Sequence, residues 1–224
     1  MLKRATSRPD LLLLLSLLLV IVMYPVLDHG DVRRMILGVL MFAPLLLATV
    51  RISERKGWVW PTVLLMAVTV LTGVVSTLFP MPTLVGLKWA LLVVFFGLTV
   101  YGLFPYLKNA RAVTDAHLYT AVSIYLLLGM QWFALYSAID IFWPGSIQHT
   151  GVAEMNRRSE LLYFSLVTLS TIGYGDIVPI RGEVRMLAAL EGVTGVLYVA
   201  ITVALLVSSY KQQGTSSEPP VTTP

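Results

Sequence analysis

The chain has 224 residues, 57% of them hydrophobic and 12% charged, with a formal net charge of +4. A soluble domain carries about 25% charged residues, so this composition is typical of a membrane protein. The basic residues lie in short loops between apolar runs, which argues against a nucleic-acid partner. The lack of cysteine excludes disulfides, thiol catalysis and cysteine-ligated zinc. With three histidines and no convergent acid–base cluster, we do not expect an enzyme.

Apolar segments divide the chain into candidate membrane spans. A span needs about 20 mostly apolar residues, and this requirement is approximately met by residues 11–27, 35–50, 58–79, 83–107, 117–142 and 184–210. The sequence therefore predicts an all-α membrane protein with six transmembrane helices. The first run is too long for a signal peptide and lacks a small-x-small cleavage site, so we interpret it as a retained span.

Loops and tails between these segments define the predicted organisation. A four-helix transmembrane domain occupies 1–107, a cytoplasmic linker 108–116, a second membrane domain 117–210 and a disordered, proline-rich tail 211–224. With the N-terminus in the cytoplasm, the inner segments carry more lysine and arginine than the outer ones. We therefore expect both termini to be cytoplasmic, in the plasma (inner) membrane.

Residues 143–183, between the last two spans, form a different kind of segment. They are too polar and too often interrupted by glycine and proline to cross a membrane, and both ends fall on the outer face. They contain a short helical candidate, RSELLYFSLVTLS, followed by TIGYGDIVP. Non-helical backbone at membrane depth is tolerated only when it is buried in protein or lines water. The segment therefore predicts a re-entrant helix and loop beside a pore or polar cavity.

The loop resembles the selectivity filter of the tetrameric potassium-channel (pore-loop) family. The matching residues are Thr171, Ile172, Gly173, Tyr174 and Gly175, followed by Asp176 and preceded by Thr168, Leu169 and Ser170. The resemblance implies K⁺ bound at residues 171–174 and no organic cofactor. A dehydrated potassium ion needs oxygens in place of its water shell. The two glycines accept the positive φ that lets successive carbonyls point the same way, and we expect Tyr174 to pack behind the strand.

Neighbouring residues would support the filter. The C-terminal end of the short helix would direct its partial negative charge at a cation. Tyr163 and Phe164 occupy the place of an aromatic cuff in the family, although generic packing explains them equally well. At Val167 some bacterial relatives carry a glutamate that bonds the aspartate after the filter, so Asp176 lacks that partner here.

The last predicted span would line the inner cavity. Gly192 and Gly195 are hinge candidates, or else sites of close helix packing. Val196, Val199, Val203 and Val207 recur at helical spacing and would form a hydrophobic gate. Glu191, a carboxylate within this span, calls for a partner. We expect a hydroxyl or backbone group behind the pore helix, or a group on a neighbouring subunit, and its role as structural or functional stays open.

Six spans with a pore loop between the fifth and sixth also resemble the voltage-gated layout. That layout needs an arginine series in the fourth span, where this chain has only Lys88, near the outer end. One charge crossing the whole field couples to about 2.3 kcal/mol per 100 mV. We therefore expect a bacterial-type six-span subunit without strong voltage gating, in which Lys88 could snorkel.

A single filter strand cannot surround an ion, so the sequence predicts a homotetramer in the lipid bilayer. The expected function is passive, potassium-selective permeation. Two alternatives stay open, namely an ion-coupled transporter and a non-conducting or regulatory subunit of a hetero-oligomeric channel. A separate regulatory protein also stays open as a partner.

Overall fold

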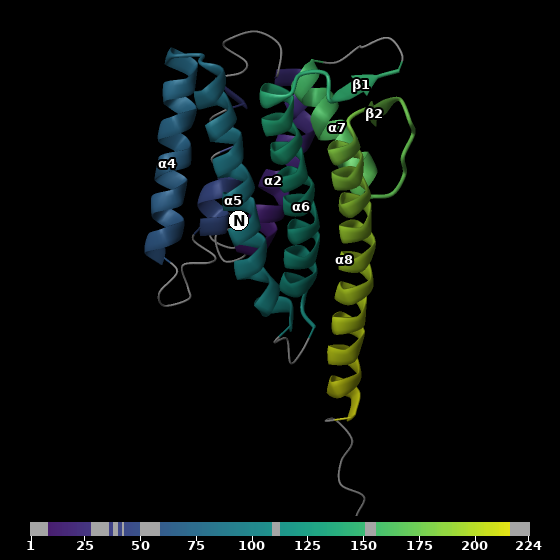
Figure 1. The fold of residues 1–224 in the computed structure, drawn as a ribbon. Helices are drawn as coiled ribbons and strands as arrows, with labels where there is room; N and C mark the ends of the chain where they lie inside the picture. Colours follow the sequence, from purple (N-terminus) through teal and green to yellow (C-terminus); the bar gives the residue numbers. More distant parts are fainter. Residues whose placement is uncertain are drawn as a thin grey trace, which may run out of the picture.

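A computed structural model describes residues 9–27, 36–37, 40–41, 43–49, 59–108, 113–150 and 156–215. Long helices lie side by side, and a short helix and a small sheet gather at one end of the bundle (Figure 1). The helices are α2 (Pro9–Leu27), α4 (Val59–Leu78), α5 (Pro82–Lys108), α6 (Asp115–Phe142), α7 (Arg157–Leu169) and α8 (Gly182–Thr215). The strands are β1 (Ile147–His149) and β2 (Ile177–Pro179), which pair antiparallel.

The predicted helical membrane architecture is confirmed. Among the described residues, α2, α4, α5, α6 and α8 are long and apolar enough to cross a membrane. Their bounds follow five of the predicted spans closely. The remaining predicted span, 35–50, lies partly outside the described residues, within which 43–49 are helical. The short helical candidate of the sequence is α7. The sheet was not predicted.

Two predicted boundaries can be compared with the structure only in part. Residues 109–112 of the linker lie outside the described residues, and α6 begins directly after Thr114, whose backbone N–H donates to His117 at 3.2 Å. The His117 ring stacks on Tyr106 of α5 at 4.5 Å, which joins the C-terminal end of α5 to the N-terminal end of α6. At the other end of the chain, α8 continues to Thr215, into the segment expected to be disordered. Residues 216–224 lie outside the description.

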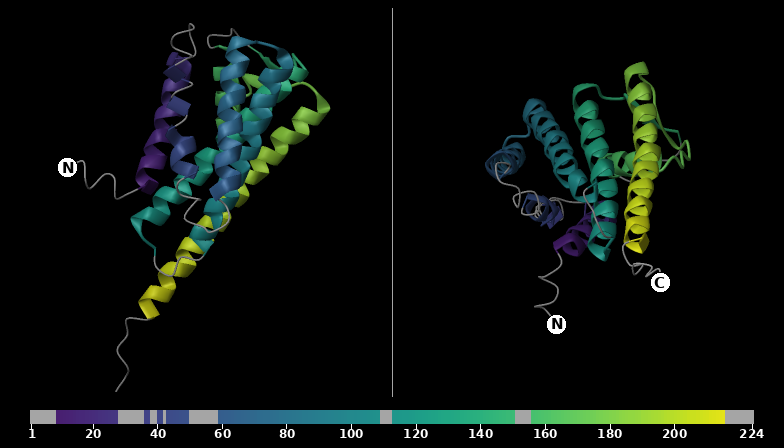
Figure 2. Two further views of the ribbon diagram at one scale, coloured as in Figure 1. Left: turned by 90° about the vertical axis from the view of Figure 1, so that its left-hand side faces the viewer. Right: turned by 90° about the horizontal axis from the view of Figure 1, so that it is seen from below.

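Helix α6 forms the centre of the bundle. In the most apolar 18-residue stretch of α6, 61% of the residues are buried, against 17% in the same kind of stretch of α4 and 22% in that of α8. Helices α4 and α8 lie on opposite sides of α6 (Figure 2). Phe133 of α6 is fully buried, and its ring meets Tyr24 of α2 and Trp89 of α5 edge-on at 5.3 and 5.1 Å. Aromatic side chains of three helices therefore close the core behind α7.

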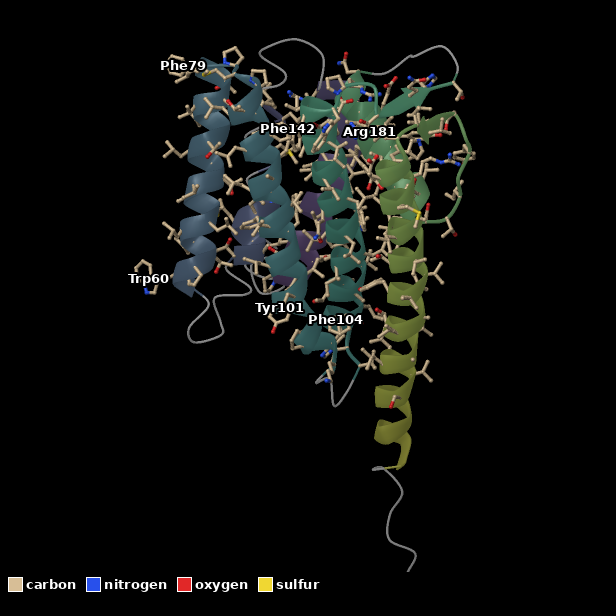
Figure 3. All side chains as sticks on the ribbon, viewed as in Figure 1. Trp60, Phe79, Tyr101, Phe104, Phe142 and Arg181 are labelled. Carbon is tan, nitrogen blue, oxygen red and sulfur yellow. The ribbon has the colours of Figure 1, made fainter. Side chains whose placement is uncertain are left out.

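Helix α4 faces away from the bundle. Leu64, Leu71 and Leu78 repeat at seven-residue spacing and are 65%, 63% and 68% exposed. Trp60 and Phe79 project at its two ends (Figure 3), and these residues are separated by about 28 Å along a helix. This separation is close to the thickness of the hydrocarbon layer, at whose borders aromatic side chains concentrate. Helix α4 therefore has the exposed surface of a lipid-facing span.

The two glycines of α8 differ in their packing. A Cβ added to Gly195 would overlap the carbonyl oxygen of Leu169, the last residue of α7. A Cβ on Gly192 would meet the nearest protein atom, the carbonyl oxygen of Thr168, at 3.7 Å, which is ordinary contact. Helix α8 runs unbroken through both positions. The geometry favours close helix packing as the role of Gly195, and the hinge role of either glycine stays a prediction.

Gly195→Ala should destabilise the protein because the new methyl group pushes α8 away from the end of α7. We expect a loss of about 1–3 kcal/mol, seen as a lower midpoint in thermal unfolding of the purified protein. The matched variant is Gly192→Ala on the same helix, which should be neutral or slightly stabilising because alanine favours a helix by roughly 1 kcal/mol over glycine. Equal effects of the two substitutions would contradict the close contact at Gly195.

Candidate ion-binding loop

The loop after α7 has an unusual backbone. Thr171, Gly173 and Gly175 have φ values of 59°, 56° and 80° and alternate with Ile172 and Tyr174, whose φ is not positive. Such alternation turns successive carbonyl groups toward one side, whereas an ordinary strand points them in alternating directions. The glycines thus have the conformation that the sequence predicted. The positive φ of Thr171 is not expected from its residue type, because a β-branched residue in the left-handed region costs roughly 1–3 kcal/mol.

The carbonyl groups of this loop are left open. Within the described part of the chain, no backbone N–H donates to the carbonyl oxygens of residues 171–174. Residues 171–175 are exposed in the single chain, with Ile172 at 56% and Tyr174 at 68%. A row of unpaired oxygens on one side of the backbone, together with the Thr171 hydroxyl, is the arrangement that can coordinate a dehydrated monovalent cation.

A cavity of about 450 Å³ lies between the loop and α8. Its lining includes Thr168, Thr171, Gly173, Gly192 and Val196. Two groups of predicted site residues, the loop and the first part of the α8 stripe, therefore share one cavity. Along the rest of that stripe, the side chains are about half exposed at Val199, Val203 and Val207.

The aromatic pair within α7, Tyr163 and Phe164, has two different roles. The ring of Tyr163 stacks on Tyr174 with centroids 6.4 Å apart and planes 5° apart. Tyr174 is therefore held against α7 but stays largely exposed in the single chain. Phe164 instead points into the core, where it is 5% exposed and meets Tyr136 of α6 at 5.0 Å. Generic packing accounts for Phe164, whereas Tyr163 lies beside the loop.

Asp176 has a partner that sequence reasoning missed. The Tyr163 hydroxyl donates to its Oδ2 at 2.8 Å, and the backbone N–H of Ile177 donates to its Oδ1 at 3.1 Å. Valine stands at position 167, where some relatives carry a glutamate, and the Tyr163 hydroxyl on the same helix makes the contact with Asp176 instead. The sequence did place Tyr163 near the loop, but as an aromatic ring and not as a hydrogen-bond donor.

The C-terminal end of the loop is attached to the segment that precedes α7. The backbone N–H of Thr150 donates to the Asp176 carbonyl at 2.8 Å, and its hydroxyl donates to the carbonyls of Gly175 and Asp176 at 3.2 and 3.0 Å. The register pairs Gln148 with Val178 in the two-stranded sheet. On the inner side, the Ser170 hydroxyl donates back to Leu166 at 2.7 Å, and the N–H of Thr171 donates to Thr168 at 2.9 Å. Both ends of the loop are therefore fixed by hydrogen bonds.

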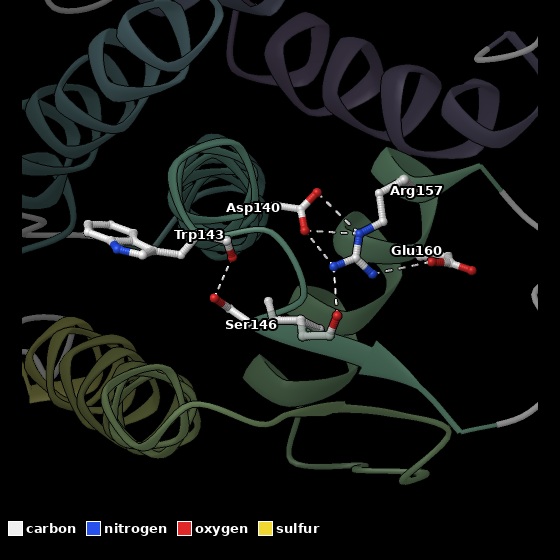
Figure 4. Close-up of polar contacts among 6 residues, drawn as sticks. Asp140, Trp143, Ser146, Arg157 and Glu160 are labelled. Carbon is white, nitrogen blue, oxygen red and sulfur yellow. Dashed lines mark hydrogen bonds and ion pairs between the residues drawn. The ribbon is translucent and has the colours of Figure 1, made fainter. Parts of the chain in front are cut away.

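An ion pair holds the start of α7. Arg157 donates to Asp140 at the end of α6 through Nε at 3.1 Å and Nη2 at 2.5 Å (Figure 4). Nη2 also donates to the Ile147 carbonyl at 2.7 Å, and Nη1 lies 3.6 Å from Glu160. The hydrogen bond to Asp140 raises the pKa of Arg157, so the guanidinium remains charged. No sequence motif indicated this contact, because it joins residues of ordinary types across three elements.

Glu191 is fully buried behind α7. The Tyr136 hydroxyl of α6 donates to its Oε2 at 2.6 Å, and the Ser165 hydroxyl of α7 lies 2.6 Å from its Oε1. Of the partners that the sequence suggested, a hydroxyl behind the short helix is the one present. The carboxyl group therefore connects the three helices that surround the loop.

Comparisons with known proteins agree with this geometry. A family model described as "Ion channel" matches residues 112–212. The chain is 35% identical over 81 residues to two pore potassium channel a of Oryza sativa subsp. japonica, which covers 36% of this chain and 20% of that protein. It is 44% identical over 46 residues to two-pore potassium channel 4 of Arabidopsis thaliana, which covers 20% of this chain and 16% of that protein. No solved structure matches.

These matches have a limited extent, since the aligned parts are a fifth or less of each relative. They nevertheless agree in kind, because the family model describes ion channels and both relatives are potassium channels. The matched residues 112–212 include α6, α7, the loop and most of α8. The combination indicates a channel rather than an enzyme. Residues 112–212 are thus similar to an ion-channel family model, and the relatives that share part of the chain are potassium channels.

Proposed function

We propose that the chain is one subunit of a homotetrameric, potassium-selective channel in the plasma (inner) membrane, with six spans and α7 as a re-entrant pore helix. Potassium ions pass through a filter formed by residues 171–175 of four chains, and bind at the oxygens of residues 171–174. One observation carries the proposal: alternate residues of the loop have positive φ, and the carbonyl oxygens of residues 171–174 accept no backbone hydrogen bond among the described residues.

The tetramer follows from the geometry of coordination. One loop presents oxygens from one side only, whereas an ion without its water shell needs them on all sides. Closed rotational symmetry supplies the remaining sides with identical loops. In this arrangement Thr168, Ser170, Tyr163 and Asp176 support the filter, and the valine stripe of α8 faces the axis below it as a hydrophobic gate.

The remaining parts of the chain take subordinate roles in this proposal. Residues 1–107 form a peripheral helical domain, 108–116 a cytoplasmic linker and 117–210 the pore domain, and both termini are cytoplasmic. The one charge of the fourth predicted span, Lys88, places its Nζ 4.6 Å from the centre of the Trp89 ring. A single lysine in a cation–π contact is a weak voltage sensor, so gating is not strongly voltage-dependent.

Flux from liposomes tests selectivity. Purified protein should pass K⁺ and exclude Na⁺, and Gly173→Ala should abolish the K⁺ flux because alanine disfavours the φ of 56° found there. Gly182→Ala is the matched control, since Gly182 has neither a positive φ nor a neighbour within 4 Å of an added Cβ, and its flux should equal that of the unmodified chain. Equal K⁺ and Na⁺ flux would refute selectivity. Transport that requires a second ion would favour the transporter, and absence of flux would favour a regulatory subunit.

Planar-bilayer recordings test the role of the first four helices. If Lys88 crossed the whole field, it would couple gating to voltage by about 2.3 kcal/mol per 100 mV for each subunit. Across 200 mV, the open probability should change by less than this coupling would produce. Lys88→Gln should leave this shallow curve unchanged. A steep curve that Lys88→Gln flattens would contradict the proposal that these helices are not a strong voltage sensor.

Tyr163→Phe should weaken the outer filter by removing the donor to Asp176. A hydrogen bond to a charged group contributes about 1.5–3 kcal/mol, so the fraction of time that the filter conducts should fall by roughly tenfold in steady recordings. Tyr119→Phe removes the same atom near the inner end of α6 and serves as the control. If both variants conduct like the unmodified channel, the Tyr163–Asp176 contact does not support conduction.

A further inference from the structure

Glu191 occupies a junction of three helices without contact with water. Its side chain lies on α8, the Tyr136 hydroxyl reaches it from α6 and the Ser165 hydroxyl from α7, and the residue is 0% exposed. The Ser165 oxygen also lies 2.9 Å from the carbonyl oxygen of Gly129 on α6. Four oxygen-bearing groups thus form a continuous chain of short contacts behind the pore helix.

Hydrogen atoms are too few for this chain if Glu191 is ionised. Ser165 has one hydroxyl proton but two oxygen neighbours, Oε1 of Glu191 and the carbonyl of Gly129. If the proton points to Gly129, the serine lone pairs face a carboxylate oxygen, which is repulsive. If it points to Glu191, the 2.9 Å contact with Gly129 contains no proton. A proton on Oε1 removes the conflict, because every contact then has one donor and one acceptor.

The charges around Glu191 lead to the same conclusion. The polar groups that act on it are the hydroxyls of Ser165 and Tyr136, and a second phenol of α6, Tyr125, also interacts with it. No cation of the described elements packed on α8 acts on Glu191. The other titratable residues of these elements are Lys88, Tyr101, Tyr106 and Lys108 on α5, Asp115, His117, Tyr119 and Asp140 on α6, Arg157, Arg158, Glu160 and Tyr163 on α7, and Glu183, Arg185 and Tyr198 on α8. A buried carboxylate with only neutral donors is costly, and such groups take up a proton instead.

We propose that Glu191 is a neutral carboxylic acid that positions the pore helix. Its Oε1–H donates to Ser165, the Ser165 hydroxyl donates to the Gly129 carbonyl, and the Tyr136 hydroxyl donates to Oε2. Helix α7 is thereby attached to α6 and α8 at the level from which it presents the filter. The effect on ion flow rests on the proposed channel function, whereas the protonation state does not.

A protonated Glu191 makes the attachment of α7 dependent on pH. Removing the proton at alkaline pH takes away the donor to Ser165 and leaves a buried negative charge among hydroxyl groups. The attachment of α7 is therefore present at neutral pH and lost as the pH rises. Conduction should fall with it, since the filter continues directly from the C-terminal end of α7.

Infrared spectroscopy tests the proton without reference to conduction. The protein in lipid at neutral pH should show the C=O stretching band of a buried protonated carboxyl, and this band should be missing from Glu191→Gln. Glu183→Gln is the matched control on the same helix, where the carboxylate side chain is 75% exposed, and it should leave the band in place. Spectra in which Glu191→Gln removes only ionised-carboxylate intensity would overturn the proposal. Absence of ion flux in the same sample would count against the channel function and not against the proton.

Variants of known hydrogen-bonding capacity test the positioning role. The glutamine amide in Glu191→Gln can donate to Ser165 and accept from Tyr136, as the acid does. This variant should conduct within about twofold of the unmodified chain and should keep its flux at alkaline pH, where the unmodified channel loses it. Glu191→Ala leaves the Tyr136 hydroxyl without an acceptor and the Ser165 oxygen without a donor, and should lower flux by roughly tenfold. A glutamine variant as impaired as the alanine variant, or an unmodified channel with flat pH dependence, would refute the positioning role of the proton.

Discussion

The unpaired backbone oxygens of residues 171–174 impose the constraint on which the proposed pore region depends. An unsatisfied carbonyl in a hydrocarbon environment costs several kcal/mol, so lipid cannot be what faces residues 171–174. The loop must therefore be held in place from behind and left open in front. The described contacts satisfy the first condition: α6, α7 and α8 converge behind the loop, and its two ends are fixed by hydrogen bonds to Thr150 and to the last turn of α7.

The supports behind the loop act at different depths. At the outer end, Arg157 joins Asp140 and the Ile147 carbonyl, and so attaches the start of α7 to α6 and β1. Near the middle, the carboxyl of Glu191 links Ser165 to Tyr136. At the inner end, Gly195 allows α8 to touch the last carbonyl of α7. A helix attached at three levels resists both tilting and sliding, and a strained residue such as Thr171 requires surroundings of this kind.

The sequence predicted those features that depend on residue type over a short stretch. Five spans followed from apolar length, α7 from the short helical candidate RSELLYFSLVTLS, and the positive φ of Gly173 and Gly175 from the motif. It did not predict the strands, which are three residues each, because so short a run gives no periodicity. It also missed the contact of Tyr163 with Asp176 and that of Arg157 with Asp140. These pairs depend on how distant elements meet, and a single sequence does not contain that information.

Exposure in this chain has the opposite meaning to exposure in a soluble protein. On a soluble surface, an apolar stripe such as Val196, Val199 and Val203 would indicate a partner. In a bilayer such a stripe can face lipid, and α4, with its row of exposed leucines, shows the same apolar surface at the edge of the bundle. The exposed polar backbone of residues 171–175 is the informative feature, since lipid cannot satisfy it. The proposed central pore therefore depends on the carbonyl groups, and of the valine stripe Val196 shares one cavity with the loop.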